Sequence, residues 1–175
     1  MSLTVPISAE DHFQGNLDAP CNLVEYGDYQ CPACGAAYPV VKQLQKHFGD
    51  RLVFVFRNFP LSQIHPMAEP AAEAAEFAAA HGKFWPMHDL LFENQDSLSD
   101  DLFQSLASKL KLPADELENA VANHEYKPRV RADFSGAIRS GVNGTPTFFI
   151  NGRRHNGPFD FDFLREAIDA ALSKG

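Results

Sequence analysis

Two cysteine thiols stand three residues apart in this sequence, at Cys31 and Cys34, and the chain has one other cysteine. Such a pair serves in thiol-disulfide exchange, as half of a zinc site or as a structural disulfide, and two thiols also fall close together by chance. Neither Cys21 nor the seven scattered histidines supply the second close pair of ligands that structural zinc commonly uses. A chain of 175 residues can also build its core without a covalent staple. The pattern therefore favours a reactive pair.

The residues around the pair predict a strand, a break and then a helix. Residues 22–26 form a short strand-like run, which Gly27 and Asp28 interrupt. From Pro32 onward, apolar residues recur at helical spacing until Gly49 ends the pattern. A cysteine pair at the start of a helix that follows a strand is itself a redox signal.

The start of this helix offers a thiolate the stabilisation that disulfide exchange requires. We expect free backbone N–H groups and the positive end of the helix dipole to point toward Cys31. Pro32 occupies the first helical position, where its missing N–H costs nothing. Cys34 lies one turn further and can resolve a mixed disulfide formed at Cys31. Cys31 is therefore the expected attacking or attacked sulfur, and Cys34 the resolving one.

The rest of the chain carries separate strand and helix signals. The unbroken apolar run 52–56 predicts a central strand that is covered on both faces. Ala, Leu, Glu and Lys dominate from about 67 to 138, which indicates four or five helices. A hairpin is expected around the Asn-Gly dipeptide at 151–152, and the apolar stripe over 161–172 predicts a terminal amphipathic helix. The predicted order is β-α-β, a helical block, then β-β-α.

Composition and charge argue against two kinds of partner. A net charge of −8 and an isoelectric point near 5.3 leave no broad basic surface for nucleic acid. No apolar run approaches the roughly 18 residues of a membrane-spanning helix, and the N-terminus lacks the basic start and apolar stretch of a secretory signal. We therefore expect no nucleic acid, no membrane insertion and a cytoplasmic location as the sequence stands. A periplasmic or secreted location is expected if an export signal was removed.

Beyond these patterns, the chain resembles the DsbA-like disulfide oxidoreductases of the thioredoxin superfamily. The resemblance covers about residues 22–172 and rests on four motifs, GDYQCPACG, FRNFPLSQIHPMA, GKFWPMHDLLFENQ and GVNGTPTFFINGRR. It implies an α/β protein with a thioredoxin-like fold and an inserted helical domain. Residues 1–62 and 141–175 would form the thioredoxin-like domain, and residues 63–140 the insertion, which agrees with the predicted order of elements.

The resemblance also implies roles for residues outside the cysteine pair. A proline before the third strand is held cis in this superfamily and faces the cysteines, so Pro146 is expected to be cis. Thr145 would present backbone groups to a substrate chain. Glu25 matches a buried acidic residue beneath the disulfide, where a raised pKa would suit a proton acceptor for Cys34.

The residues between the cysteines depart from those of the strongly oxidising members. Those members carry Pro-His, and the histidine helps to stabilise the thiolate, whereas this chain carries Pro32-Ala33. The pKa of Cys31 is therefore expected in the upper half of the roughly 3.5–7.5 range that such motifs reach. A less stabilised thiolate makes the disulfide more stable, so we expect a less oxidising protein.

The implied activity is that of a protein-disulfide oxidoreductase that needs no metal and no organic cofactor. Its partners would be protein or peptide thiols and disulfides, together with an unidentified redox partner. Two alternatives stay open, a glutathione-linked isomerase of the same fold and a non-enzymatic module that binds a client. Some reactive or charged residues are expected to pack or to face solvent instead of reacting: Cys21, His65, Trp85, Arg153, Arg154 and His155.

Overall fold

The computed structural model describes residues 1–174 and centres on a five-stranded sheet in the order β1-β3-β2-β4-β5. The strands are β1 (His12–Gln14), β2 (Cys21–Gly27), β3 (Leu52–Asn58), β4 (Thr147–Ile150) and β5 (Arg153–Arg154). β2 and β3 run parallel, while the other pairs are antiparallel. The strand that leads into the cysteine pair therefore lies at the centre of the sheet, hydrogen-bonded on both sides.

Alternation along the strands gives the sheet two buried faces. Leu23, Phe54 and Phe148 belong to one core cluster, together with apolar residues of α1 (Pro32–Phe48) and α7 (Phe161–Lys174). The opposite face packs against α6 (Lys127–Arg139) and the N-terminal segment, through Val24, Tyr26, Val55, Phe149, Leu3, Ile7, Phe134 and Ala137. Helices thus cover the sheet on both sides, which explains why β3 reads as an unbroken apolar run.

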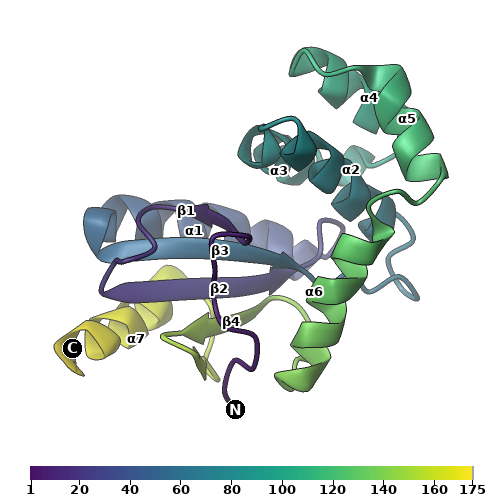
Figure 1. Cartoon of the computed structure of the whole chain (residues 1–175). Helices are drawn as coiled ribbons and strands as arrows, with labels where there is room; N and C mark the ends of the chain where they lie inside the picture. The colour runs from purple at the N-terminus through teal and green to yellow at the C-terminus, as the bar shows by residue number, and fades with distance from the viewer. Residues whose placement is uncertain (175) are drawn as a thin grey trace.

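A block of helices separates β3 from β4 in the chain. It comprises α2 (Ala68–Ala80), α3 (Phe84–Glu93), the 3₁₀ helix η2 (Gln95–Ser97), α4 (Asp100–Lys109), α5 (Ala114–Ala122) and α6. Helices α2, α4 and α5 stand away from the sheet near the C-terminal ends of β2 and β3, whereas α3 lies beside β1, where the Trp85 indole donates to the Phe13 carbonyl oxygen (Figure 1). The expected four or five helices are confirmed, and the described elements form an α/β protein whose helical block lies between β3 and β4.

The insertion is not wholly separate from the sheet. α6 lies within residues 63–140, yet its Ala137 is fully buried against strand residues such as Val55. α2 is rich in alanine and buried on most of its surface, because the short side chains let neighbouring helices approach closely. The division into 1–62, 63–140 and 141–175 as domains stays a prediction.

The C-terminal elements match the sequence prediction, whereas the first strand was not foreseen. Asn151 and Gly152 have φ values of 46° and 80°, as a two-residue hairpin turn between β4 and β5 requires. β1 pairs antiparallel with β3 at the edge of the sheet. It has three half-buried residues and is therefore too short to show a periodic pattern.

Candidate active site

Cys31 is the N-cap residue of α1, directly after the turn that leaves β2. Asp28 builds this turn, because its Oδ1 accepts the backbone N–H groups of Gln30 at 2.7 Å and Cys31 at 3.1 Å. Pro32 follows in the first helical turn, as predicted. Its exposed ring lies beside the nearly buried Cys31, which is 7% exposed. The turn thus presents one sulfur at the end of the sheet.

The surroundings of Cys31 lower the pKa of its thiol to about 5. The largest cause is a hydrogen bond with the Cys34 thiol, and the side chain of Thr145 and the backbone N–H groups of Cys34 and Ala33 add to it. Burial opposes the shift. A pKa of about 5 lies near the middle of the range considered above, and the expectation of a value in its upper half stays a prediction. Neutral donors acidify Cys31 strongly without a histidine.

Cys34 has the opposite character. Its side chain is 0% exposed, and burial, followed by the hydrogen bond with Cys31, raises the pKa of its thiol well above the ordinary value. The two sulfurs therefore form an asymmetric pair. The thiol of Cys31, at the start of α1, is acidic, and the fully buried thiol of Cys34 stays protonated. This asymmetry is what disulfide exchange with an internal resolving step requires.

Glu25 lies on β2, opposite Phe56 on one side and Phe148 on the other. Its side chain is 2% exposed, and its Oε2 has no hydrogen-bond partner within residues 1–174. Burial and then the charge on Cys31 raise the pKa of this carboxyl to about 8. The sequence prediction that Glu25 is buried with a raised pKa is confirmed. Its part in proton transfer stays a proposal.

The Thr145–Pro146 peptide bond is cis, as the family resemblance implied. The carbonyl oxygen of Thr145 lies 3.6 Å from the Cys31 sulfur, although the two residues are 114 positions apart in the chain. The Thr145 hydroxyl is buried and belongs to the surroundings that lower the pKa of Cys31. Ala33 is partly buried and packs against the larger core cluster. The structure thus brings the cysteine pair and the Thr145 backbone to one place.

Sequence reasoning missed the role of Asp28 and set His65 aside. Asp28 is almost completely buried, and besides capping the cysteine turn its Oδ2 accepts from the backbone N–H of Leu61 at 2.9 Å. The same oxygen lies 2.8 Å from Nδ1 of His65. Asp28 therefore ties the loop after β3 to the turn before Cys31. An aspartate three residues ahead of a helix start is a turn signal, but its second set of partners is distant in sequence.

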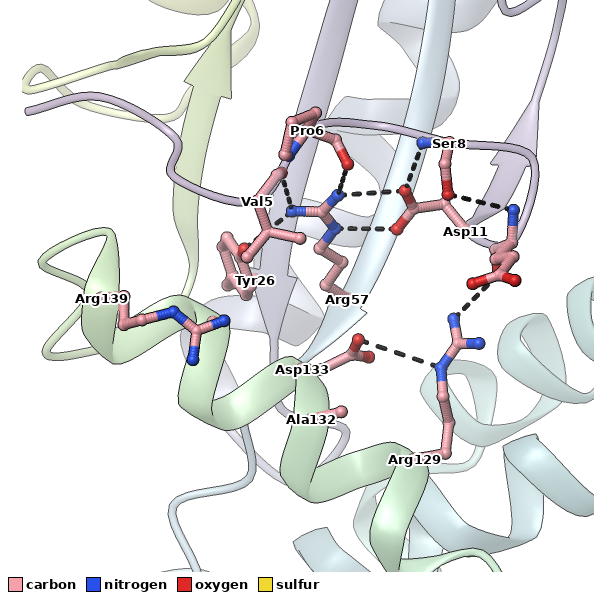
Figure 2. A pocket seen from close by; sticks show the side chains of 12 residues that line it. Val5, Pro6, Ser8, Asp11, Tyr26, Arg57, Arg129, Ala132, Asp133 and Arg139 are labelled. Atoms are coloured by element: carbon pink, nitrogen blue, oxygen red, sulfur yellow. Dashed lines mark hydrogen bonds and ion pairs between the residues drawn. The ribbon is translucent and has the colours of Figure 1, made fainter.

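A hollow of about 300 Å³ lies elsewhere, between the N-terminal segment and α6 (Figure 2). Arg57 points into it, and its five N–H groups bind Asp11 twice, the carbonyls of Val5 and Pro6, and the Tyr26 hydroxyl. No donor of this guanidinium remains for a ligand. Arg57 therefore holds the N-terminal segment in place, and we call this set of contacts the N-terminal clamp. Neither cysteine of the pair lines the hollow.

Within residues 1–174, no three His, Cys, Asp or Glu side chains are grouped so as to hold a metal ion. Over the same residues, no helix is both long and apolar enough to cross a membrane. The cytoplasmic location expected from the sequence stays a prediction.

Comparison with known proteins gives one family match. The family model described as thioredoxin matches residues 8–170. A curated relative, the Na(+)/H(+) antiporter NhaA 1 of Salinispora arenicola, is 41% identical over 174 residues, which are 99% of this chain and 26% of the relative. A second, the NhaA 1 antiporter of Mycobacterium sp. (strain KMS), is 43% identical over 97% of this chain and 28% of its own length. The chain thus spans about a quarter of these relatives.

Solved structures resemble the whole chain. Oxidised BdbD from Bacillus subtilis has a TM-score of 0.85 and 27% identity, with 94% of each chain covered. Alpha-DsbA1 from Wolbachia pipientis has a TM-score of 0.84 and 22% identity, over 98% of this chain and 95% of its own. At the latter identity the likeness concerns the fold alone.

Proposed function

The chain belongs to the thioredoxin family as a DsbA-like member, and from this premise we propose that it is a thiol-disulfide oxidoreductase acting on protein or peptide thiols. The observation that carries the proposal is the asymmetry of the cysteine pair. An acidic Cys31 thiol stands at a helix start, and a buried Cys34 thiol with a raised pKa lies behind it. A structural cysteine pair has no need of such a difference in acidity.

In the oxidising direction, the Cys31–Cys34 disulfide accepts electrons from two substrate thiols. A substrate thiolate attacks the Cys31 sulfur, and Cys34 leaves as a thiolate that takes up a proton. The second substrate thiolate then attacks the substrate sulfur of the mixed disulfide and displaces the Cys31 thiolate. Because the pKa of Cys31 is about 5, it is a good leaving group at neutral pH. The substrate gains one disulfide and the protein becomes a dithiol.

Glu25 is the proposed proton carrier for Cys34. Its charge raises the pKa of the Cys34 thiol, which places the carboxyl in the same buried region as that sulfur. With a pKa of about 8, Glu25 is mostly protonated at pH 7 and can give its proton to the departing Cys34. In the reducing direction, the ionised carboxylate accepts the Cys34 proton before that sulfur attacks the mixed disulfide.

Thr145 and Pro146 are the proposed floor of the substrate groove. The Thr145 carbonyl is 3.6 Å from the Cys31 sulfur, so a substrate chain that joins this sulfur must pass beside residues 145–146. Pro146 has no N–H, and the backbone of this segment is therefore free to meet the extended chain of a substrate. Protein or peptide disulfides, rather than small thiols, are the substrates that such main-chain contacts favour.

We also propose an intermediate oxidising strength. Thioredoxin has a thiol pKa of about 7 and a potential of about −270 mV, whereas DsbA has about 3.5 and about −120 mV. A Cys31 pKa of about 5 lies between these two pKa values, which supports a reduction potential between those of thioredoxin and DsbA. Ala33 brings no cation to the thiolate, which supports a protein less oxidising than members with Pro-His. The direction of physiological exchange then depends on the partner's potential.

The deciding experiment combines insulin reduction with peptide oxidation, both followed in single and double cysteine variants. We expect Cys31→Ser and the double serine variant to lose all turnover, and Cys34→Ala to accumulate mixed disulfides. Cys21→Ser is the matched control, because this buried thiol, whose pKa is raised to about 11, should leave turnover unchanged. Isomerase activity that survives Cys34→Ala would favour the glutathione-linked alternative. Client binding by the double serine variant, without turnover in the native protein, would favour a binding module.

A further inference from the structure

Gln95, in the helical block, donates hydrogen bonds from its side chain to backbone carbonyls on both sides of the Cys31 N–H group. Gln95 opens the 3₁₀ helix η2, and its Nε2 donates to the carbonyl oxygen of Tyr29 at 2.9 Å and to that of Cys31 at 2.8 Å. These partners are 66 and 64 positions away in the chain. The amide therefore joins the inserted helices directly to the turn that carries the reactive sulfur.

Gly35 provides the space that Gln95 occupies. It lies in α1, one residue after Cys34, and a Cβ placed on it would overlap Oε1 of Gln95. Its φ is not in the left-handed region, and helix propensity there favours alanine over glycine. Close approach of the Gln95 amide, rather than backbone conformation, is thus the physical reason for a glycine at this position.

Tyr29 gives the helical block a second hold on the same turn. Its hydroxyl is hydrogen-bonded to Nδ1 of His88 on α3 at 2.9 Å, and its ring packs 4.9 Å from that of Phe92. Tyr29 is 1% exposed, so both contacts are buried. The side chain and the carbonyl of this residue are therefore held by α3 and η2, two positions before Cys31.

We propose that Gln95 is a positioning residue through which the helical block fixes the backbone at Cys31 and thereby the orientation of its thiolate. The inference rests on the proposed function, since orientation matters only if Cys31 reacts. The sulfur relies on backbone N–H groups of Ala33 and Cys34 and lies near the Thr145 carbonyl. Its direction toward these groups follows from the peptide planes that Gln95 holds. The N–H group that Gln95 donates to the Cys31 carbonyl also offsets the partial negative charge of that oxygen, which belongs to the same residue as the sulfur.

The test is Gln95→Met, which keeps the length of the side chain and removes both donors. We expect the thiol pKa of Cys31, read from thiolate absorbance against pH, to rise by about one unit. The corresponding tenfold change in the exchange equilibrium is a fall of about 30 mV in potential, measured against glutathione. Gln104→Met on α4 is the matched control, because Gln104 makes no side-chain hydrogen bond within residues 1–174. It should leave both values unchanged.

A double-mutant cycle that combines Gly35→Ala with Gln95→Ala tests the proposal if Gln95→Met folds poorly. Gly35→Ala alone should displace Gln95 and raise the Cys31 pKa in the same direction. In the Gln95→Ala background, Gly35→Ala should leave the pKa where Gln95→Ala puts it and raise the melting temperature, since the overlap is gone. Lower melting temperatures with an unchanged Cys31 pKa would reduce Gln95 to a structural contact and overturn the proposal. An ordinary thiol pKa in the native protein would instead refute the proposed function itself.

Discussion

Replacing Glu25 by glutamine should abolish a pH dependence of stability that this buried carboxyl causes. Burial, and next the charge on Cys31, raise its pKa from 4.5 to about 8 in the folded, reduced protein. The native state thus holds a proton that the unfolded chain releases above about pH 4.5. The contribution of Glu25 is therefore most favourable below pH 4.5, declines as the pH rises to about 8, and is constant above that.

The size of the effect follows from the width of that window. A shift of 3.5 pKa units corresponds to about 5 kcal/mol of unfolding free energy between pH 4.5 and 8. Glu25→Gln keeps the shape of the side chain and cannot ionise. We therefore expect the variant to gain up to about 5 kcal/mol over the reduced native protein at pH 9. At pH 4 the two proteins should be nearly equal, because both are uncharged at this position.

The assay is urea unfolding of the reduced proteins at several pH values between 4 and 9, compared as a difference between variant and native protein. Glu166→Gln is the control, since Glu166 is exposed on α7 and should give a flat difference. The oxidised native protein should lose less stability than the reduced one between pH 4.5 and 8, because without the Cys31 thiolate the pKa of Glu25 is raised less and the window is narrower. A difference between Glu25→Gln and native protein that does not change with pH would refute the reasoning.

Three further predictions concern the surroundings of the pair. Ala33→His should lower the Cys31 pKa and raise the reduction potential by about 30 mV for each tenfold gain in thiolate stability. A redox titration against glutathione measures this potential. An unchanged potential would show that residue 33 does not set the redox strength. Asp28→Ala leaves two N–H groups of the cysteine turn without their acceptor and should cost about 1–2 kcal/mol, measured by urea unfolding of the oxidised protein; full stability would mean that water replaces the carboxylate. Arg57→Met leaves the buried Asp11 carboxylate without its ion-pair partner and should lower the free energy of unfolding by roughly 3–5 kcal/mol, with the Cys31 pKa unchanged. A shift in the Cys31 pKa would link the N-terminal clamp to the active site.

The part of the site that depends on local sequence could be predicted. Strand, break and helix around Cys31 follow from short-range patterns, and alternation along β2 places Glu25 on the face that α1 covers. The cis bond before Pro146 followed from the family resemblance of its motif. These features need only residues that are neighbours in the chain, or a motif that a family repeats.

The missing part depends on contacts between distant segments. Gln95 meets Cys31 across 64 positions, and His65 meets Asp28 across 37. Neither polar side chain carries a periodic signal that would reveal its partner. The groups that acidify Cys31 were missed for a related reason, because the sequence directs attention to the residue between the cysteines. The structure draws the stabilisation from the Cys34 thiol, the helix N–H groups and Thr145 instead.

The proposed function depends on the difference in acidity between Cys31 and Cys34, and a thiol titration of the reduced protein measures that difference directly. Thiolate absorbance and the rate of alkylation should both show Cys31 ionising near pH 5, with Cys34 still protonated above pH 9. Cys31→Ser should remove the acidic transition, and Cys21→Ser should retain it. Two thiols that titrate together near the ordinary cysteine pKa of about 8.5 would contradict the account.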